Sequence, residues 1–228
     1  MEQMNNQQDR IGQAPEAAAQ QNMSRQSMQV RIDAAIPCAD PDPMLQYVFS
    51  MFAVMTWIST VHVMSDDVLF VSGILQICLG TAAFVGSLIN LKRGDPHGNI
   101  NLILSVILGF AAGLTQIASV VCKAYSIHFH PWIMSIILLT GGIYMLCFLP
   151  LLKKMPLYVF VSHLCVSLGF LCRAIADLAS IPVLMNVGAW LLLIFALTAF
   201  YQGVSLMYAQ YGIHIPQGVS FQTLTEKS

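Results

Sequence analysis

The feature that most constrains the fold of this sequence is a succession of six apolar runs, each long enough to cross a bilayer. A spanning helix needs about 20 mostly apolar residues, because roughly 30 Å of hydrocarbon is crossed at about 1.5 Å per residue. Open sheets cannot satisfy their edges in lipid. The sequence therefore predicts an all-α fold, a polytopic membrane protein with six transmembrane helices in an antiparallel bundle. The predicted spans are Met44–Met64, Val68–Leu91, Asn99–Cys122, Pro131–Leu152, Pro156–Leu178 and Leu184–Tyr211.

Composition supports a membrane protein and argues against several other classes. Hydrophobic residues make up 57% of the 228 residues and charged residues only 9%, whereas soluble domains carry about a quarter charged residues. The net charge of −1 indicates neither a nucleic-acid partner nor an acidic one. Six spans with short loops leave no room for a separate catalytic domain, so membrane lipid and a small solute are the expected partners.

Motifs for catalysis or metal binding are not found in the sequence. The six cysteines show no CxxC or His-Cys spacing, and we interpret them as small packing residues. There is no HExxH, GxSxG or phosphate loop, and no pair of carboxylates is embedded together in the spans. The prediction is a protein that is not an enzyme, with no cofactor, no metal site and no catalytic residue.

The two ends of the chain differ from its centre. Residues 1–38 are rich in Gln and Asn and have no apolar period, so they cannot bury enough surface to offset their ordering entropy. We predict a disordered cytoplasmic tail there, and the segment lacks the apolar core of a signal peptide. Residues 39–212 form the predicted transporter domain, and residues 213–228 form a predicted cytoplasmic C-terminal tail.

Loop charges predict the orientation. Cytoplasmic loops carry an excess of Lys and Arg, and the basic loops follow the second and fourth spans. Both termini are therefore predicted to be cytoplasmic in an integral, multi-pass protein. We expect the plasma membrane, with an organelle membrane as the alternative. The charged loop residues are Lys92, Arg93, Lys153 and Lys154 in the basic loops, and Asp66, Asp67 and Lys123 in the others.

The fifth run carries ionisable residues although it is long enough to span the membrane. Arg173 and Asp177 are four residues apart, so on a helix they share one face and can neutralise each other. Two interpretations remain open, a structural ion pair near a helix end and a role in a solute path. His62 and His163 are candidates for a proton relay because imidazole titrates near neutral pH, although a packing role is the commoner one.

Small residues in the spans predict close helix contacts. Gly109 and Gly113 form a G-x-x-x-G pattern, which lets two helices approach closely in membranes. The favoured interpretation is simple helix packing. Polar residues such as Gln76 and Gln116 would be penalised by lipid, and most of them are expected to hydrogen-bond between helices.

A series of short motifs resembles the acetate uptake transporter family, also called the succinate–acetate permease family. Asp40 to Leu45, DPDPML, resembles the family's Asn-Pro-Ala-Pro-Leu-Gly-Leu before the first helix. Leu91 to Gly98, LKRGDPHG, is similar to the Tyr-Lys-Lys-Gly-Asn-Thr-Phe-Gly loop. Later landmarks are AIAD at 174–177, Ala-Trp at 189–190 and Ala-Phe-Tyr at 199–201, which resemble Ala-Ile-Gly-Asn, Gly-Trp and Ala-x-Tyr. Their order and spacing cover the chain from about Asp40 to Gly212.

The resemblance implies a six-helix protomer with a central path for a small monocarboxylate, assembled as a homo-oligomer, typically a hexamer, with uptake often coupled to protons. It also implies a pore constriction at Phe49, Ser105 and Val166. Ser105 departs from the family's large aromatic, which should widen or wet the constriction. Asp40, Asn90 and Asp177 also depart from the family pattern and make the interior less favourable to an anion. The pathway candidates are Asp40, Asn90, Tyr144, Arg173, Asp177, Trp190 and Tyr201.

Three functions follow as hypotheses. The first is a channel or transporter for acetate or a similar monocarboxylate, which can be coupled to protons by symport. The second is a channel or exporter for ammonia, ammonium or another small neutral solute, which the departures at Asp40, Asn90 and Asp177 favour. The third is a membrane scaffold or sensor that transports nothing and recruits partners through its Gln-rich tail.

Overall fold

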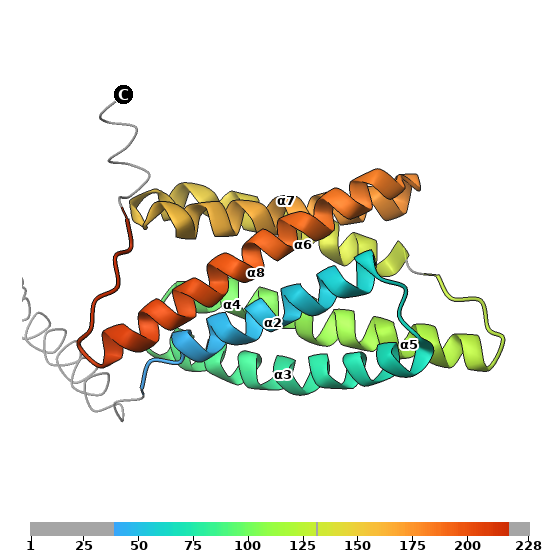
Figure 1. Cartoon of the computed structure of the whole chain (residues 1–228), viewed down its shortest axis with the longest axis horizontal. Helices are drawn as coiled ribbons and strands as arrows, with labels where there is room; N and C mark the ends of the chain where they lie inside the picture. The colour runs from blue at the N-terminus through green and yellow to red at the C-terminus, as the bar shows by residue number, and fades with distance from the viewer. Residues whose placement is uncertain (1–38, 131, 219–228) are drawn as a thin grey trace, which may run out of the picture. The chain divides into compact units, whose positions relative to one another are not determined.

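The computed structural model describes residues 39–130 and 132–218, which are helical except for short connections and a final extended segment (Figure 1). Within these residues the predicted all-α fold is confirmed. The helices are α2 (Asp42–Val61), α3 (Asp66–Lys92), α4 (His97–Leu104), the π-helix η1 (Ser105–Ala111), α5 (Ala112–Ala124), α6 (Trp132–Phe148), the 3-10 helix η2 (Leu149–Lys154), α7 (Leu157–Ala179) and α8 (Pro182–Gln210).

In the described part of the chain, six helical spans are long and apolar enough to cross a membrane, as the sequence predicted. The third span, His97–Ala124, is composite, because α4 and α5 continue through the π-helical turn η1. The fourth, Trp132–Lys154, combines α6 with η2. A π-helical segment departs from regular i→i−4 bonding and often occurs at functional sites. The apolar pattern alone did not predict it.

Local sequence explains where several helices begin and end. Proline occupies the first turn of α2 and begins α8, a position where the missing N–H costs nothing. Ser180 takes a left-handed conformation with φ 56° and ends α7. The Ile181 N–H then donates to the Ala176 carbonyl at 2.9 Å, which satisfies a carbonyl at the helix end.

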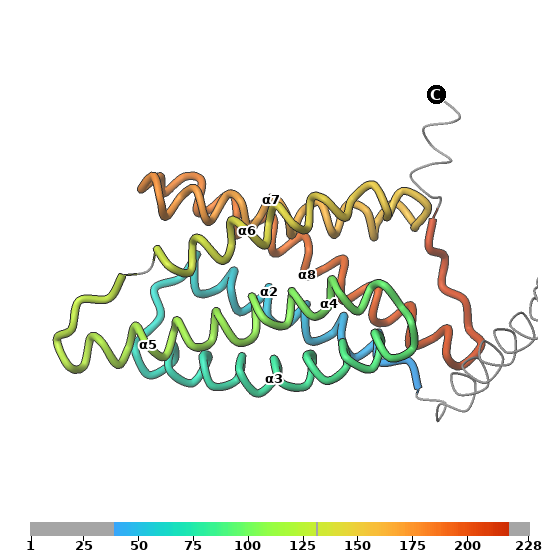
Figure 2. Tube along the Cα trace, turned by 180° about the vertical axis from the view of Figure 1, so that it is seen from behind, coloured from blue at the N-terminus to red at the C-terminus, as the bar shows by residue number. Residues whose placement is uncertain are grey.

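The spans pack so that each has neighbours on two sides. α8 lies between α2 and α7, and α6 packs on α7. α3 packs against α2 and against the whole third span, and η1 in turn contacts both α2 and α6. Figures 1 and 2 show the first three spans on one side and α6 with α7 on the other, with α8 crossing between them. Side chains from all six spans can therefore meet in the interior of the bundle.

The bundle has two chemically different ends. We call the end that holds Arg93, Lys153 and Lys154 the basic end; there α2 begins and α8 finishes. We call the opposite end the far end; it carries the connections 62–65, 125–130 and 180–181. The two names describe positions along the bundle and do not assign a side of the membrane.

Two glycine pairs bring α3 close to the third span. An added Cβ at Gly109 would lie 2.7 Å from the Gly80 Cα, and one at Gly113 would lie 2.7 Å from the Gly73 carbonyl oxygen. Both approaches are backbone to backbone, and only glycine permits them. The G-x-x-x-G pattern at 109 and 113 therefore serves helix packing, the interpretation that the sequence favoured.

The predicted tails lie largely beyond the described part of the chain. Residues 1–38 and 219–228 fall outside the described residues, so the disordered-tail prediction stays a prediction. The described start of the C-terminal tail returns along α8. There the Tyr201 hydroxyl donates to the Pro216 carbonyl at 2.6 Å, and Gln217 Nε2 donates to Ser205 Oγ at 3.1 Å.

Candidate solute pathway

An internal cavity of about 180 Å³ lies in the half of the bundle toward the far end. All spans except α3 contribute to its wall. Its apolar floor is formed by Leu108, Phe170 and Leu192, and six of the nine other lining residues are polar or charged, although the surface as a whole is mainly apolar. The other lining residues are Thr56, Ser59, Ala112, Thr115, Gln116, Met134, Leu138, Arg173 and Asp177.

Arg173 and Asp177 both line this cavity, but they do not pair directly. Arg173 donates through a guanidinium nitrogen to Thr60 Oγ1 on α2. Asp177 Oδ2 accepts a hydrogen bond from Ser135 Oγ on α6 at 3.0 Å. No salt bridge between the two is present in the described part of the chain. The predicted mutual ion pair is therefore corrected: neighbouring helices offer each charge a different partner.

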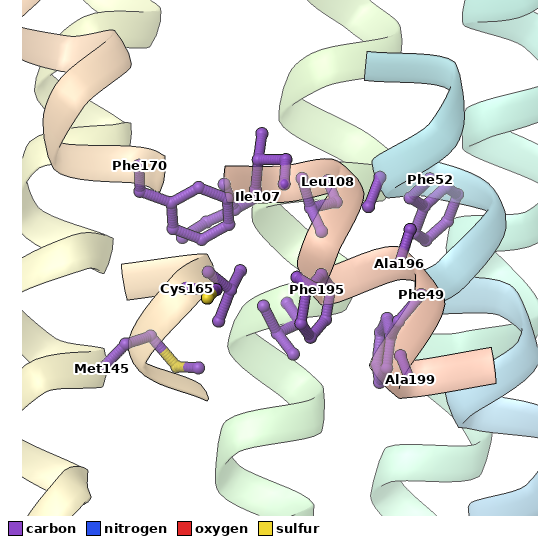
Figure 3. Packing of buried hydrophobic residues seen from close by; sticks show 14 of the residues in the cluster. Phe49, Phe52, Ile107, Leu108, Met145, Cys165, Phe170, Phe195, Ala196 and Ala199 are labelled. Carbon is purple, nitrogen blue, oxygen red and sulfur yellow. The ribbon is translucent and has the colours of Figure 1, made fainter. Parts of the chain in front are cut away.

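An apolar plug closes the interior below the cavity. We use this name for Phe49, Phe52, Leu108, Val166, Phe170, Leu192 and Phe195, all of them buried. Figure 3 shows the rings of Phe49, Phe52, Phe170 and Phe195 converging from α2, α7 and α8. The plug forms the floor of the cavity, because Leu108, Phe170 and Leu192 belong to both.

The predicted constriction residues lie in this closed region. Phe49, Ser105 and Val166 each have 0% exposure, so no water-sized space adjoins them. Phe49 and Val166 belong to the main apolar core. Ser105 begins the π-helix, donates to the Asn101 carbonyl at 2.7 Å and lies 3.4 Å from Ser87 Oγ on α3. A small hydroxyl at this place adds a polar contact beside the plug.

A buried polar cluster lies on the other side of the plug, toward the basic end. Asp42 Oδ1 accepts from Asn90 Nδ2 of α3 at 2.5 Å and from Asn101 Nδ2 of α4 at 3.3 Å. Asn90 is 0% and Asn101 4% exposed. One carboxylate thus holds the first three spans together. The sequence analysis selected Asn90 as a pathway candidate but missed Asp42. The only sequence feature that marks Asp42 is its place in the DPDP motif.

Two polar side-chain contacts lie at the basic end. Asp40 pairs with Arg93 at 3.0 Å, and its carbonyl accepts from Gln210 Nε2 at 3.1 Å. Asp95 Oδ1 lies 2.9 Å from His97 Nδ1. Asp40 therefore has a cationic partner, which reduces the repulsion of an anion that the sequence predicted for this residue.

Three of the predicted pathway residues lie on the outer surface of the bundle. Tyr144 is 43%, Trp190 52% and Tyr201 40% exposed. Each contacts another aromatic ring, with centroid distances of 5.0 Å to Phe148, 5.5 Å to Trp57 and 5.3 Å to Tyr158 respectively. None of the three lines the cavity described above.

The two predicted relay histidines are also separate from the cavity lining. His62 ends α2 on the exposed far end, with its ring centroid 6.4 Å from that of Trp57. His163 is buried, and its Nδ1 lies 2.9 Å from the Val159 carbonyl one turn earlier. This contact is the ordinary way in which a histidine in an apolar helix satisfies a ring nitrogen.

Removing the carboxylate at Asp42 should destabilise the protein. Asp42→Ala leaves the buried amides of Asn90 and Asn101 without their acceptor, a loss typically costing about 1–3 kcal/mol. The measurement is the thermal unfolding midpoint of the purified protein in detergent. Asp66→Ala is the matched control, because it removes a carboxylate from an exposed pair with Lys123, typically worth about 0–1 kcal/mol. Equal shifts in the two variants would contradict the expectation.

Comparison with known proteins found a match for the structure but none for the sequence. No family model matches the sequence, and no curated protein matches it. The structure, however, matches the solved structure of the bacterial acetate channel SatP with a TM-score of 0.63 at 18% sequence identity. The chain has that channel's fold. The match covers 79% of this chain and 99% of the channel, so it extends over nearly the whole channel rather than one hairpin. The fold implied by the sequence landmarks is thereby confirmed.

Proposed function

We propose that this protein is a membrane channel or transporter for acetate or a similar small monocarboxylate, and a divergent member of the acetate uptake transporter family. The observation that carries the proposal is the cavity inside the bundle, where Arg173 supplies a positive charge without a directly paired carboxylate. A guanidinium in a low-dielectric site attracts a carboxylate strongly and can bind it through two N–H groups. The shared fold with the acetate channel and the ordered sequence landmarks support the same function.

The proposed path runs from the cavity through the plug to the Asp42 cluster. In this closed conformation the plug blocks passage, since Phe49, Ser105 and Val166 have no exposed surface. Conduction requires these side chains to separate, and the irregular π-helix η1 borders them. Irregular helical segments absorb such rearrangements at lower cost than regular ones. We therefore propose Phe49, Ser105 and Val166 as the constriction and η1 as the element that moves.

We propose the orientation, the proton coupling and the oligomeric state from the loop charges and from the family resemblance. The basic end faces the cytoplasm under the positive-inside rule, which places both chain termini there. Uptake is coupled to protons, and the protein assembles as a homo-oligomer, a hexamer by resemblance. Apolar side chains exposed along α3, α7 and α8 provide surface for lipid and for neighbouring copies.

The test is uptake of radiolabelled acetate into proteoliposomes containing the purified full chain, with and without an inward proton gradient. We expect saturable uptake above that of empty liposomes, and stimulation by the gradient if protons are coupled. Folding is checked in the same preparation by size exclusion and circular dichroism. Folded protein that moves methylammonium but no acetate would favour the ammonium hypothesis, and movement of neither would favour the scaffold or sensor.

A further inference from the structure

Two opposite charges line one small cavity and form no direct ion pair there. Arg173 is hydrogen-bonded to Thr60 on α2, whereas Asp177 is hydrogen-bonded to Ser135 on α6. They are the two charged side chains among the cavity-lining residues. A solute in this space therefore meets a cationic and an anionic group on the wall formed by α7.

Each hydroxyl group of the cavity wall donates its one proton in a hydrogen bond to a backbone carbonyl of the same span. Thr56 donates to the Phe52 carbonyl at 2.8 Å, Ser59 to the Thr56 carbonyl at 2.9 Å and Thr115 to the Ala111 carbonyl at 2.6 Å. A hydroxyl has one donor and two acceptor lone pairs. These three groups consequently present acceptor oxygens, and no further donors, to whatever occupies the cavity.

Gln116 adds an acceptor that is short of a partner. Its Oε1 is buried and has no hydrogen-bond partner within the described residues, although the side chain lines the cavity. A buried acceptor without a donor carries a desolvation penalty that a suitable ligand removes. Asp177 and the three hydroxyl oxygens are therefore the acceptors of the lining that stand opposite its one cationic donor group, Arg173.

We propose that the cavity selects a small zwitterion, an α-amino acid of the size of glycine or alanine. Its carboxylate binds Arg173, and its ammonium group donates to Asp177 and to hydroxyl oxygens of the lining. This inference rests on the proposed function in one respect: both require that a solute with a carboxylate group enters the cavity. A plain monocarboxylate satisfies Arg173 but leaves Asp177 facing a like charge, whereas a zwitterion compensates both charges, which is favoured where charge is poorly solvated.

The size and position of the cavity agree with this class of solute. About 180 Å³ corresponds to about six water volumes of roughly 30 Å³ each, enough for a solute of a few heavy atoms. Asp177 also lines a more open groove at the far end, together with Thr60, Ser180 and Asn186. The anionic group thus lies where the cavity and this groove meet.

The experiment compares three solutes that share one carbon skeleton. Binding of radiolabelled L-alanine to the full chain in nanodiscs is competed with propionate, which lacks the ammonium group, and with ethylamine, which lacks the carboxylate. We expect alanine to bind about tenfold or more tightly than either, because each lost charged hydrogen bond weakens binding by about that factor. Liposome flux of alanine and propionate is measured in parallel.

Asp177→Asn separates recognition from structure, because the amide oxygen can still accept from Ser135. We expect this variant to lose the preference for alanine over propionate, whereas Asp66→Asn, at an exposed position of the far end, keeps it. Propionate flux with no tighter binding of alanine would overturn the inference and leave the proposed function standing. Unchanged alanine preference in Asp177→Asn would also overturn it. Alanine flux without propionate flux would support the inference and argue against a general monocarboxylate carrier. If neither alanine nor propionate moved, both the inference and the proposed function would be overturned.

Discussion

Replacing Arg173 with methionine is expected to lower acetate uptake about tenfold or more, because the variant loses the one cationic group of the cavity lining. Methionine keeps an unbranched stem in the space beside Gly188, where an added Cβ would lie 2.8 Å from the Arg173 Cγ. The bundle should therefore remain folded. The measurement is the initial rate of radiolabelled acetate uptake into proteoliposomes, normalised to reconstituted protein.

Two further variants show whether charge in the cavity causes the loss. Arg173→Lys retains a positive charge without the planar fork of donors and should give an intermediate rate. Lys153→Met removes a cation from an exposed position at the basic end and should leave uptake near the wild-type rate. Wild-type uptake in Arg173→Met, with the protein folded, would remove Arg173 from the path and with it the main support for the proposed function.

Replacing Gly109 with valine is expected to destabilise the protein by about 3 kcal/mol or more, at or beyond the upper end of the cost of overpacking. The new Cβ would lie 2.7 Å from the Gly80 Cα and 3.3 Å from Phe52 Cζ. A side chain can rotate away from an intruding methyl group, but the backbone of α3 cannot, so the helices must separate. We expect a low yield of monodisperse protein and a lowered unfolding midpoint in detergent.

Ala118→Val is the matched control, because it also adds methyl groups to the third span but on an exposed side of α5. Its effect should be small, close to the difference in helix propensity of a few tenths of a kcal/mol. If Gly109→Val were as stable as Ala118→Val, the close approach of α3 to the third span would not be needed for stability.

The membrane fold could be predicted well because lipid imposes a simple rule on the sequence. Each predicted span agrees within a few residues with an observed helical span, from Asp42–Val61 to Pro182–Gln210. The irregular elements were not predicted. η1 lies within a continuous apolar run and η2 at the end of one, and hydropathy does not distinguish a π-turn or a 3-10 turn from an α-helical one.

The sequence selected two charged residues that line the cavity, but it did not reveal their contacts. Arg173 and Asp177 stood out because a charge in an apolar run is costly, and both line the cavity. Their spacing of four residues permits a pair on one helix face, but it carries no information about Thr60 or Ser135 on other helices. Gln116 was given as an example of polar residues expected to hydrogen-bond between helices, but within the described residues its Oε1 has no hydrogen-bond partner.

The sequence by itself determined six membrane-spanning helices, their antiparallel order and the presence of two charges in the fifth span, because apolar length and charge cost are local properties. Only the tertiary structure decided which residues face the interior. The spans are apolar on nearly every side, so their sequences do not mark an inner face, and Tyr144, Trp190 and Tyr201 proved to be exposed. The plug, the cavity and the Asp42 cluster each require side chains from several helices, and those contacts depend on helix packing.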